Sequence, residues 1–255
     1  MARARVPGAQ PVIADGPVLP PPPDRAALLA AYALPDRDTR RVRMNFVASL
    51  DGAATLEGRS GGLGDASDRL AMQVLRTLAD VVLVGAGTVR VEGYGGLAVG
   101  EEDAAWRVAR GLPGQPRLAV VSSSLDLDPD SAFFTAAVTR PIVVTHAAAP
   151  AARRAALEQV ADVIVAGEQA VDLRAMLDLL ADRGLRQVLC EGGPHLFGAL
   201  LEADLVDELC LSLSPMLVGG DAGRIVRGAP ELECRMHLVH AIPAGDLVLL
   251  RYRRG

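Results

Sequence analysis

The residues best suited to chemistry form the tetrapeptide Glu-Gly-Gly-Pro at positions 191–194. The apolar residues 188–190 before it predict the end of a buried strand, and the pattern after it predicts a helix over 195–203 with proline near its start. Glycine permits such a turn and allows a ligand to approach the backbone closely. The helix N-terminus offers unpaired N–H groups and the positive end of the helix dipole. The turn therefore suits a phosphate or pyrophosphate, although a glycine pair on its own is more typical of an ordinary strand-to-helix turn.

A second turn of this kind follows the apolar run 81–84, which predicts a strand buried on both faces of a parallel sheet. Gly85 and Gly87 form the turn, and Thr88 is placed to cap the next helix and to offer a hydroxyl to a phosphate. The glycine spacing differs from the Rossmann fingerprint, and a Walker loop is excluded because all 26 basic residues are arginine. Two glycine-bearing strand ends in one sheet favour a cofactor with a long phosphate bridge.

The elements that position these turns alternate between strand and helix patterns, which predicts the α/β class. Strands are expected at 41–49, 81–84, 118–121, 141–145, 163–165 and 186–190, and helices at 24–32, 65–78, 151–160, 172–182 and 195–203, with a loop-rich stretch at 93–116. The last quarter is β-prone at 209–217, 234–241 and 247–252, with a hairpin signal at 243–246. The sequence therefore predicts a mainly parallel central sheet with an antiparallel C-terminal edge and flanking helices. The apolar face of the helix at 65–78 carries Leu70, Met72, Leu75 and Leu78.

Composition bounds the class of function. The 255 residues suffice for one large domain, and we divide the chain into a proline-rich arm with a short helix (1–40) and a single domain (41–255). A net charge of −5 and 3% aromatic residues argue against a nucleic-acid partner. No apolar stretch suits a signal peptide or a membrane span, so we expect a cytoplasmic protein without a membrane partner. The three cysteines and four histidines show no metal-ligand spacing, and no metal site is expected.

Four segments of the chain have an order and spacing that together resemble those of a known family. They are 44–52 (Met-Asn-Phe-Val-Ala-Ser-Leu-Asp-Gly), 85–90 (Gly-Ala-Gly-Thr-Val-Arg), 191–194, and 205–209 (Leu-Val-Asp-Glu-Leu) followed by Ser214-Pro215. From residue 41 onward the chain resembles the reductase domain of riboflavin biosynthesis, the C-terminal part of RibD, which has a dihydrofolate-reductase-like fold. The resemblance implies NADPH as cofactor and a reaction like that of 5-amino-6-(5-phosphoribosylamino)uracil reductase, which opens the ribose of a ribosylamino-pyrimidine phosphate to a ribityl chain. The zinc-deaminase signature of bifunctional members does not precede residue 41, so we expect a stand-alone reductase.

Matched positions transfer the family's binding roles to this chain. The resemblance implies cofactor contacts from Val47, Gly87, Thr88, Val89, Ser122, Ser123, Gly192, Gly193, Pro194, His195 and Leu196. Ser122 and Ser123 are the candidates for the adenosine 2′-phosphate, with a helix cap or turn as the alternative. The resemblance implies a small heterocyclic substrate held by Ser60, Arg76, Glu92 and Glu191, and Asn45 joins them because it lies on the first strand.

Two carboxylates are candidate catalytic residues, Glu191 and Asp51. Glu191 stands at the carboxyl end of a strand, where an open α/β sheet binds its ligand, and a carboxylate there suits the amino and amide edge of a pyrimidine or pteridine. Asp51 follows the first strand and is placed to face the ring. Arg76 suits a phosphate or carboxylate, or a salt bridge to a nearby acid. Asp68 is interpreted as a first-turn helix charge and not as a site residue.

One stretch departs from the family pattern. After the Glu92 position the riboflavin enzymes usually have Asp-Pro or Asn-Pro and then an arginine for the substrate phosphate, whereas here no positive charge follows until Arg107. Dihydrofolate or another pterin therefore competes with the riboflavin intermediate as substrate. A catalytically silent NADP(H)-binding protein is a third interpretation, and a polyproline-bearing scaffold is a fourth. The apolar alternation at 209–213 and 247–250 exceeds what one sheet face needs, which predicts a homodimer.

Overall fold

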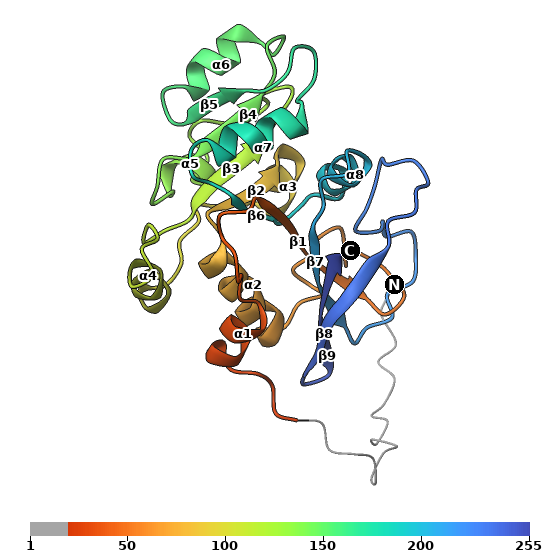
Figure 1. Ribbon diagram of the computed structural model, residues 1–255. Coiled ribbons are helices and arrows are strands. Elements are labelled where there is room, and N and C mark those ends of the chain that lie inside the picture. The colour runs from red at the N-terminus through yellow and green to blue at the C-terminus, as the bar shows by residue number, and fades with distance from the viewer. Residues whose placement is uncertain (1–19) are drawn as a thin grey trace.

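The computed structural model describes residues 20–255, so most of the predicted proline-rich arm lies outside the described residues. Within them, nine strands form one sheet. In chain order the strands are β1 (Arg41–Ser49), β2 (Val81–Gly85), β3 (Arg117–Val121), β4 (Ile142–Thr145), β5 (Asp162–Val165), β6 (Gln187–Cys190), β7 (Glu208–Ser214), β8 (Met236–Ala244) and β9 (Leu247–Arg254). Their order across the sheet is β5-β4-β3-β2-β6-β1-β7-β9-β8 (Figure 1).

The sheet is parallel from β5 to β7 and antiparallel beyond, which confirms the predicted α/β architecture. β1 pairs in parallel with both β6 and β7, while β9 pairs antiparallel with β7 and β8. The hairpin between β8 and β9 turns at Gly245, whose φ of 71° favours glycine. Because the strands from β5 to β7 are parallel, their carboxyl ends meet at one edge of the sheet.

Eight helices connect the strands within the described residues. They are α1 (Arg25–Ala31), α2 (Ala66–Leu78), α3 (Ala86–Glu92), α4 (Glu101–Val108), α5 (Ala132–Thr135), α6 (Ala151–Leu157), α7 (Leu173–Ala181) and α8 (Pro194–Glu202). The side chains of Asp24, Asp65 and Asp172 accept backbone N–H groups and cap α1, α2 and α7. Among residues 20–255 we find no helix with the length and apolar character needed to cross a bilayer.

One helix lies where the sequence predicts a loop. α4 occupies part of the stretch 93–116, and the acidic residues Glu101, Glu102 and Asp103 form its first turn. Acids in a first turn are stabilised by the positive end of the helix dipole. The loop prediction was wrong here because the flanking glycines and prolines dominate the pattern and hide this short helix.

The two faces of the sheet pack against different helices. Val82 and Val84 of β2 share one apolar cluster with α1 and α2, while Val81 and Leu83 of the same strand share another with α7 and α8. This alternation is what a strand buried on both faces requires. The result is a three-layer core in which α1 lies beside α2 on one face (Figure 1).

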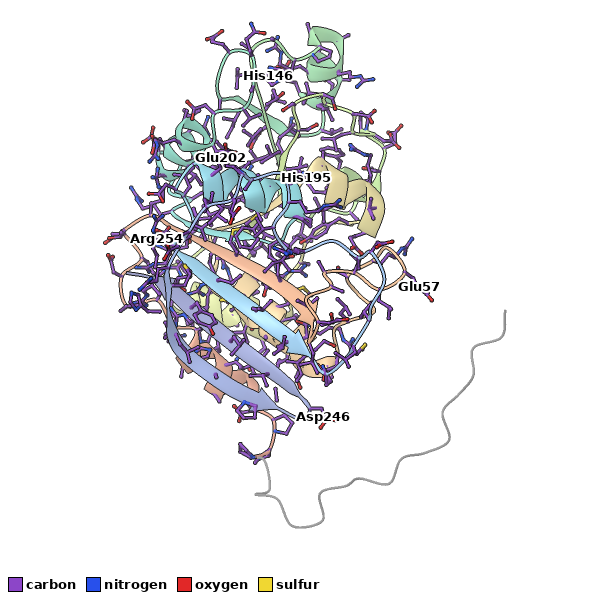
Figure 2. The ribbon with its side chains drawn as sticks, turned by 90° about the vertical axis from the view of Figure 1, so that its right-hand side faces the viewer. Glu57, His146, His195, Glu202, Asp246 and Arg254 are labelled. Carbon is purple, nitrogen blue, oxygen red and sulfur yellow. The ribbon has the colours of Figure 1, made fainter. Side chains whose placement is uncertain are left out.

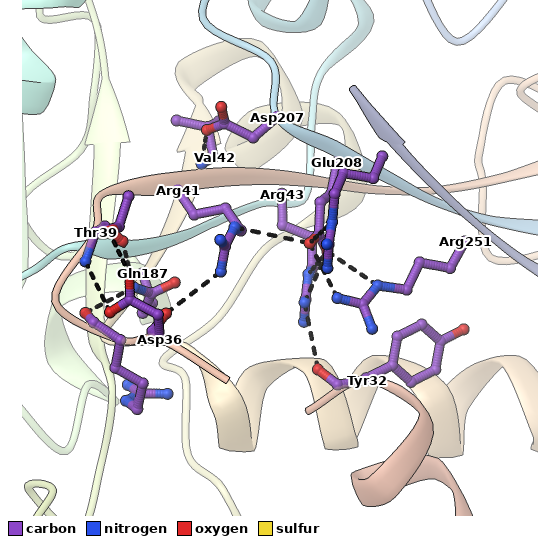
Figure 3. A network of polar contacts seen from close by, with 12 residues as sticks. Tyr32, Asp36, Thr39, Arg41, Val42, Arg43, Gln187, Asp207, Glu208 and Arg251 are labelled. Atoms are coloured by element: carbon purple, nitrogen blue, oxygen red, sulfur yellow. Dashed lines mark hydrogen bonds and ion pairs between the residues drawn. The ribbon is translucent and has the colours of Figure 1, made fainter. Parts of the chain in front are cut away.

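A buried ion cluster fastens β1 to β7, β9 and the end of α1 (Figure 3). The Glu208 carboxylate has no exposed surface and is paired with Arg43 at 2.8 Å and with Arg251 at 2.9 Å. Arg43 also donates to the carbonyl of Tyr32, and Arg251 to that of Ala31. Burial acts to raise the pKa of Glu208, but the two guanidinium groups outweigh it and lower the pKa to about 2.

The outer face of the antiparallel strands is apolar and half-buried. Its residues alternate with buried neighbours along β7 and β9, and they form the cross-strand pairs Leu209–Tyr252, Leu211–Leu250 and Leu213–Val248. In Figure 2, where Asp246 marks the β8–β9 hairpin, this end of the sheet faces the viewer and no helix of the described residues lies in front of it.

Candidate active site

A cavity of about 350 Å³ opens at the carboxyl ends of β1 and β6. Its walls come from residues 45–47 of β1, the loop 54–64, one side of α2, the helix α3 and the turn after β6. The volume lies within the range of small-molecule sites, about 300–1,000 Å³. Its position agrees with the general rule that open α/β sheets bind ligands beyond the carboxyl ends of their strands.

The cavity brings together residues that the sequence assigns to substrate and to cofactor. All five substrate candidates line it, namely Asn45, Ser60, Arg76, Glu92 and Glu191. Five cofactor candidates line it as well, namely Val47, Thr88, Gly192, Gly193 and Pro194. Gly87 and Val89 lie on α3, and His195 and Leu196 lie at the start of α8, beside this wall.

The helix α2 turns one face toward the cavity. Asp68, Met72 and Arg76 are spaced by four residues and all line it. The sequence places Met72 on the apolar face of the helix, but it lines the cavity, and the buried face of α2 is formed by Ala71, Val74, Leu75, Thr77 and Leu78. The same helix therefore packs against the sheet with one side and presents charged groups to the cavity with the other.

The central charged group of the cavity is a three-residue cluster. The Arg76 guanidinium donates to both oxygens of Glu191, at 2.7 and 2.6 Å, and to the Tyr94 hydroxyl at 2.9 Å. Tyr94 in turn donates to Glu191 at 2.5 Å. Burial acts to lower the pKa of Arg76, but the paired carboxylate outweighs it and raises it, while burial and then Glu191 raise the pKa of Tyr94. The Arg76 guanidinium therefore stays protonated across neutral pH, and Tyr94 keeps its hydroxyl proton.

A second acid holds the loop 54–64 at the cavity, which is called the covering loop below. Glu92, at the end of α3, accepts a hydrogen bond from the Ser60 backbone N–H at 3.0 Å. Two residues that the sequence predicts as substrate contacts therefore meet, and the Glu92 side chain positions the loop that carries Ser60.

The glycine turn after β6 packs directly on the turn after β2. The N–H of Gly85 donates to the carbonyl of Gly192 at 2.7 Å, and Gly192 has a φ of 116°, which side chains other than hydrogen rarely permit. A Cβ on Gly193 would stand 2.6 Å from the Thr88 hydroxyl oxygen. Both glycines are therefore required by close approach or by conformation.

The helices after these two turns begin without side-chain caps. Gly193 caps α8 and Gly85 caps α3, and neither supplies a side chain to the first N–H groups. The prediction that Thr88 caps its helix was wrong, because α3 starts at Ala86 and Thr88 lies inside its first turn. His195 is exposed at the start of α8 (Figure 2).

Buried polar groups without partners lie at the ends of β3 and β4. The Oγ of Ser122, the Oγ1 of Thr145 and the Nδ1 of His146 have no hydrogen-bond partner in the described part of the chain. The backbone N–H of Ser122 donates to the Val144 carbonyl at 2.9 Å, so the ends of these two strands lie side by side. Ser123 is exposed. Since the Ser122 hydroxyl is unpaired, it serves no cap.

The structure places Asp51 away from the charged cluster. Its carboxylate accepts the Ser49 hydroxyl and the backbone N–H groups of Val218 and Gly219, the latter at 2.7 Å. These hydrogen bonds, that of Ser49 first, lower the pKa of Asp51 to about 2. The residue faces a different hollow of the surface and joins the end of β1 to the loop after β7. Asp51 therefore does not line the cavity that contains Glu191, and its catalytic role stays a prediction.

Arg107 and Arg69 differ in what they can bind. Arg107 has no exposed surface, and its guanidinium donates to the carbonyls of Thr77, Ala79 and Pro113. Arg69, which lines the cavity from α2, is exposed and forms no hydrogen bond or ion pair through its side chain among the described residues. The positive charge available to an anionic ligand is therefore that of Arg69.

Sequence reasoning missed four residues of this region. Asp68 was detectable from its four-residue spacing to Met72, once Arg76 is taken as a site residue. Thr145 and His146 follow a strand end just as Ser122 does, which was a usable signal. Tyr94 lies in a glycine-rich loop and no local pattern marks it.

Comparisons with known proteins find relatives that cover most of the chain. Residues 40–250 match the family model described as RibD C-terminal domain. The chain is 31% identical over 216 residues to a 2,5-diamino-6-ribosylamino-4(3H)-pyrimidinone 5′-phosphate reductase of Archaeoglobus fulgidus, covering 84% of this chain and 98% of the relative. A protein of the same description from Methanothermobacter thermautotrophicus is 30% identical, covering 83% and 96%. The crystal structure of a pyrimidine reductase-like protein from Corynebacterium diphtheriae is similar with a TM-score of 0.80 and 29% identity, covering 89% and 98% of the two chains.

Proposed function

The chain belongs to the RibD C-terminal domain family, and on that premise we propose that it is an NADPH-dependent reductase of a ribosylamino-pyrimidine 5′-phosphate. The observation that carries this proposal is the single cavity in which the glycine turn and the Arg76–Glu191–Tyr94 cluster adjoin. A dinucleotide and a heterocycle are thereby given adjacent places at one sheet edge.

The strand order supports an extended dinucleotide along this edge. The ends of β4, β3, β2, β6 and β1 follow one another across the sheet. The polar groups of Ser122 and His146 stand at one end of the row, the glycine turns in the middle, and the cavity at the other end. The uncapped N-terminus of α8 suits the pyrophosphate, since free N–H groups and the helix dipole both favour an anion.

The residues present fit this cofactor by an independent test. Buried hydroxyl and imidazole groups without partners are destabilising unless a ligand or water supplies the missing hydrogen bonds. Ser122, Thr145 and His146 are such groups, and they lie where the row of strand ends would place the adenosine half. Gly193 packs close to the Thr88 hydroxyl, so that hydroxyl lies beside the turn and would join its backbone N–H groups in binding a phosphate. NADPH would thus be held by these residues, with Val47 and the glycine turn toward its nicotinamide.

The reduced nicotinamide would supply a hydride to the electrophilic sugar carbon of the substrate. The residues of this chain bind, orient and exclude water. Arg76 and Tyr94 hold Glu191 in one position against the substrate, and Glu92 holds the covering loop over it. Arg69 is placed to pair with the substrate phosphate, the role that Arg107 cannot take because its guanidinium is bound to backbone carbonyls.

Steady-state kinetics test the proposal. Purified protein should oxidise NADPH with the ribosylamino-pyrimidine 5′-phosphate, should be slower with its dephosphorylated form, and should bind NADPH more tightly than NADH in a fluorescence titration. Dihydrofolate is the control heterocycle from the same general class. Turnover of dihydrofolate but not of the pyrimidine would replace the proposed substrate, and tight NADPH binding without any turnover would favour a silent binding protein.

We also propose that two copies associate through the apolar face of β7 and β9. Leu211, Leu213 and Leu250 are half-buried there, and no helix of the described residues lies in front of this face in Figure 2. Apolar sheet faces of this kind are typical of subunit interfaces.

A further inference from the structure

Asp68 presents an incompletely satisfied carboxylate to the substrate cavity. It lies one turn before Met72 and two turns before Arg76 on the cavity face of α2. Its Oδ2 atom rests against Gly64, where a Cβ would come within 2.2 Å of it. Gly64 itself lines the cavity. The covering loop therefore leaves room for this carboxylate at the cavity wall.

Few groups of the protein satisfy this carboxylate. Among residues 20–255 the side-chain hydrogen bond to Asp68 comes from the hydroxyl of Ser212 on β7. Burial, Asp65 and Glu191 all raise its pKa above the ordinary 3.8, whereas Ser212 and Arg69 lower it, and the net direction is upward. A carboxylate offers about four acceptor positions, so most of those of Asp68 remain for a ligand.

Glu191, the other carboxylate of the cavity, differs in this respect. Both of its oxygens already accept from Arg76, and one accepts from Tyr94 as well. Additional donors from a substrate would have to displace these charge-assisted hydrogen bonds. The sequence assigns the amino and amide edge of the ring to Glu191, but the structure offers the free acceptors at Asp68.

The donors that match such a carboxylate are two parallel N–H groups. A 2-amino-4(3H)-pyrimidinone offers its exocyclic amine and its ring N3–H on one edge, in the arrangement by which a guanidinium meets a carboxylate. A uracil has a carbonyl oxygen at the same 2-position. That oxygen would face the carboxylate without a proton between them and leave a buried charged acceptor unsatisfied.

We propose that Asp68 determines which pyrimidine this enzyme reduces, by binding the 2-amino and N3–H groups of a 2,5-diamino-pyrimidinone and rejecting the corresponding uracil. The inference rests on the proposed function, since it names the substrate of that site. It also gives the enzyme a place in a reaction sequence: the hydrolytic deamination that exchanges the 2-amino group for oxygen follows the reduction and acts on its product.

The test measures kcat/KM for both pyrimidines with the wild-type chain and with Asp68→Asn. An asparagine has about the same size but one donor and one acceptor end, so it no longer favours a pair of donors. We expect the wild type to prefer the diamino compound about 10- to 100-fold, and Asp68→Asn to reduce that ratio to near unity through a higher KM for the diamino compound. Calorimetric titration of each pyrimidine without coenzyme should show the same change in preference.

A matched control is Asp65→Asn, which changes a neighbouring acid at the cap of α2. Its carboxylate accepts the N–H groups of Ser67 and Asp68 and does not line the cavity, and asparagine is an equally good cap. This variant should keep the wild-type preference. An NADPH titration verifies that each variant is folded.

The outcomes separate the two proposals. Turnover of neither pyrimidine by the wild type overturns the proposed function and this inference with it. Turnover of both with equal kcat/KM, a preference for the uracil, or an Asp68→Asn variant that keeps the full preference overturns the inference alone.

Discussion

Substitution of Gly193 by alanine tests whether the glycine turn binds the coenzyme. The added Cβ would lie 2.6 Å from the Thr88 Oγ1, a separation at which one of the two must move. The φ of Gly193, −86°, is open to alanine, so the strain is steric and not conformational. Overpacking of this kind costs about 1–3 kcal/mol. If the backbone of the turn shifts to relieve the contact, NADPH binding becomes roughly 5- to 150-fold weaker.

The assay is a fluorescence titration with NADPH, accompanied by thermal denaturation to detect any general loss of stability. Thr88→Ala removes the opposing hydroxyl, so Gly193→Ala should have a much smaller effect in that background than in the wild type. Gly100→Ala is the matched control, because a Cβ there meets nothing within 4 Å and the residue lies at the cap of α4. Two results would refute the reasoning. One is a Gly193→Ala variant that binds NADPH as tightly as the wild type, and the other is an equal loss of NADPH affinity in the wild-type and Thr88→Ala backgrounds.

Three further predictions concern the charged cluster, the core and the subunit contact. Tyr94→Phe removes a buried hydrogen bond to Glu191, worth about 1.5–3 kcal/mol, and should lower kcat/KM about 10- to 100-fold while NADPH affinity stays constant; a parallel fall in affinity would contradict it. Glu208→Gln should cost about 3 kcal/mol at pH 7, because the pKa of Glu208 is lowered from 4.5 to about 2. Because the pKa of this acid is lowered in the fold, its charge stabilises the fold above pH 4.5, and that stabilisation is lost as pH falls toward 2. The free energies of unfolding of the two proteins, measured by urea denaturation, should therefore converge in acid. Leu211→Asp should convert a dimer to a monomer in light scattering, and a monomeric wild type would exclude the proposed contact.

The sequence predicts those elements whose pattern is decided locally. The run 81–84 is apolar and β-branched, a glycine follows it, and both observations have one common explanation, a buried strand that ends in a turn. The cap at Asp65 and the hairpin at 243–246 are of the same kind. In each case a few adjacent residues determine the local backbone conformation, so that conformation does not depend on the rest of the chain.

Side-chain roles that depend on distant residues were beyond such reasoning. Asp51 follows the first strand as predicted, but its role is decided by the N–H groups of Val218 and Gly219, which arrive from the loop after β7. Asp68 has a sufficient local explanation as a first-turn charge, and only the placement of Ser212 beside it reveals a cavity carboxylate. The pairing of Tyr94 with Arg76 and Glu191 joins three separate segments of the chain in the same way.

The energetics of the cavity argue for catalysis over silent nucleotide binding. A protein that only binds a dinucleotide needs the glycine turns and the polar ends of β3 and β4, and nothing more. Here the adjoining cavity also contains Asp68, Arg76 and Glu191, and withdrawing each of these charges from water is unfavourable. Arg76 and Glu191 offset that cost by pairing with each other, but Asp68 has no cationic hydrogen-bond partner among the described residues. A substrate that brings its own N–H donors would complete its hydrogen bonding, so the unbalanced acid favours a site that takes up a second molecule beside the coenzyme.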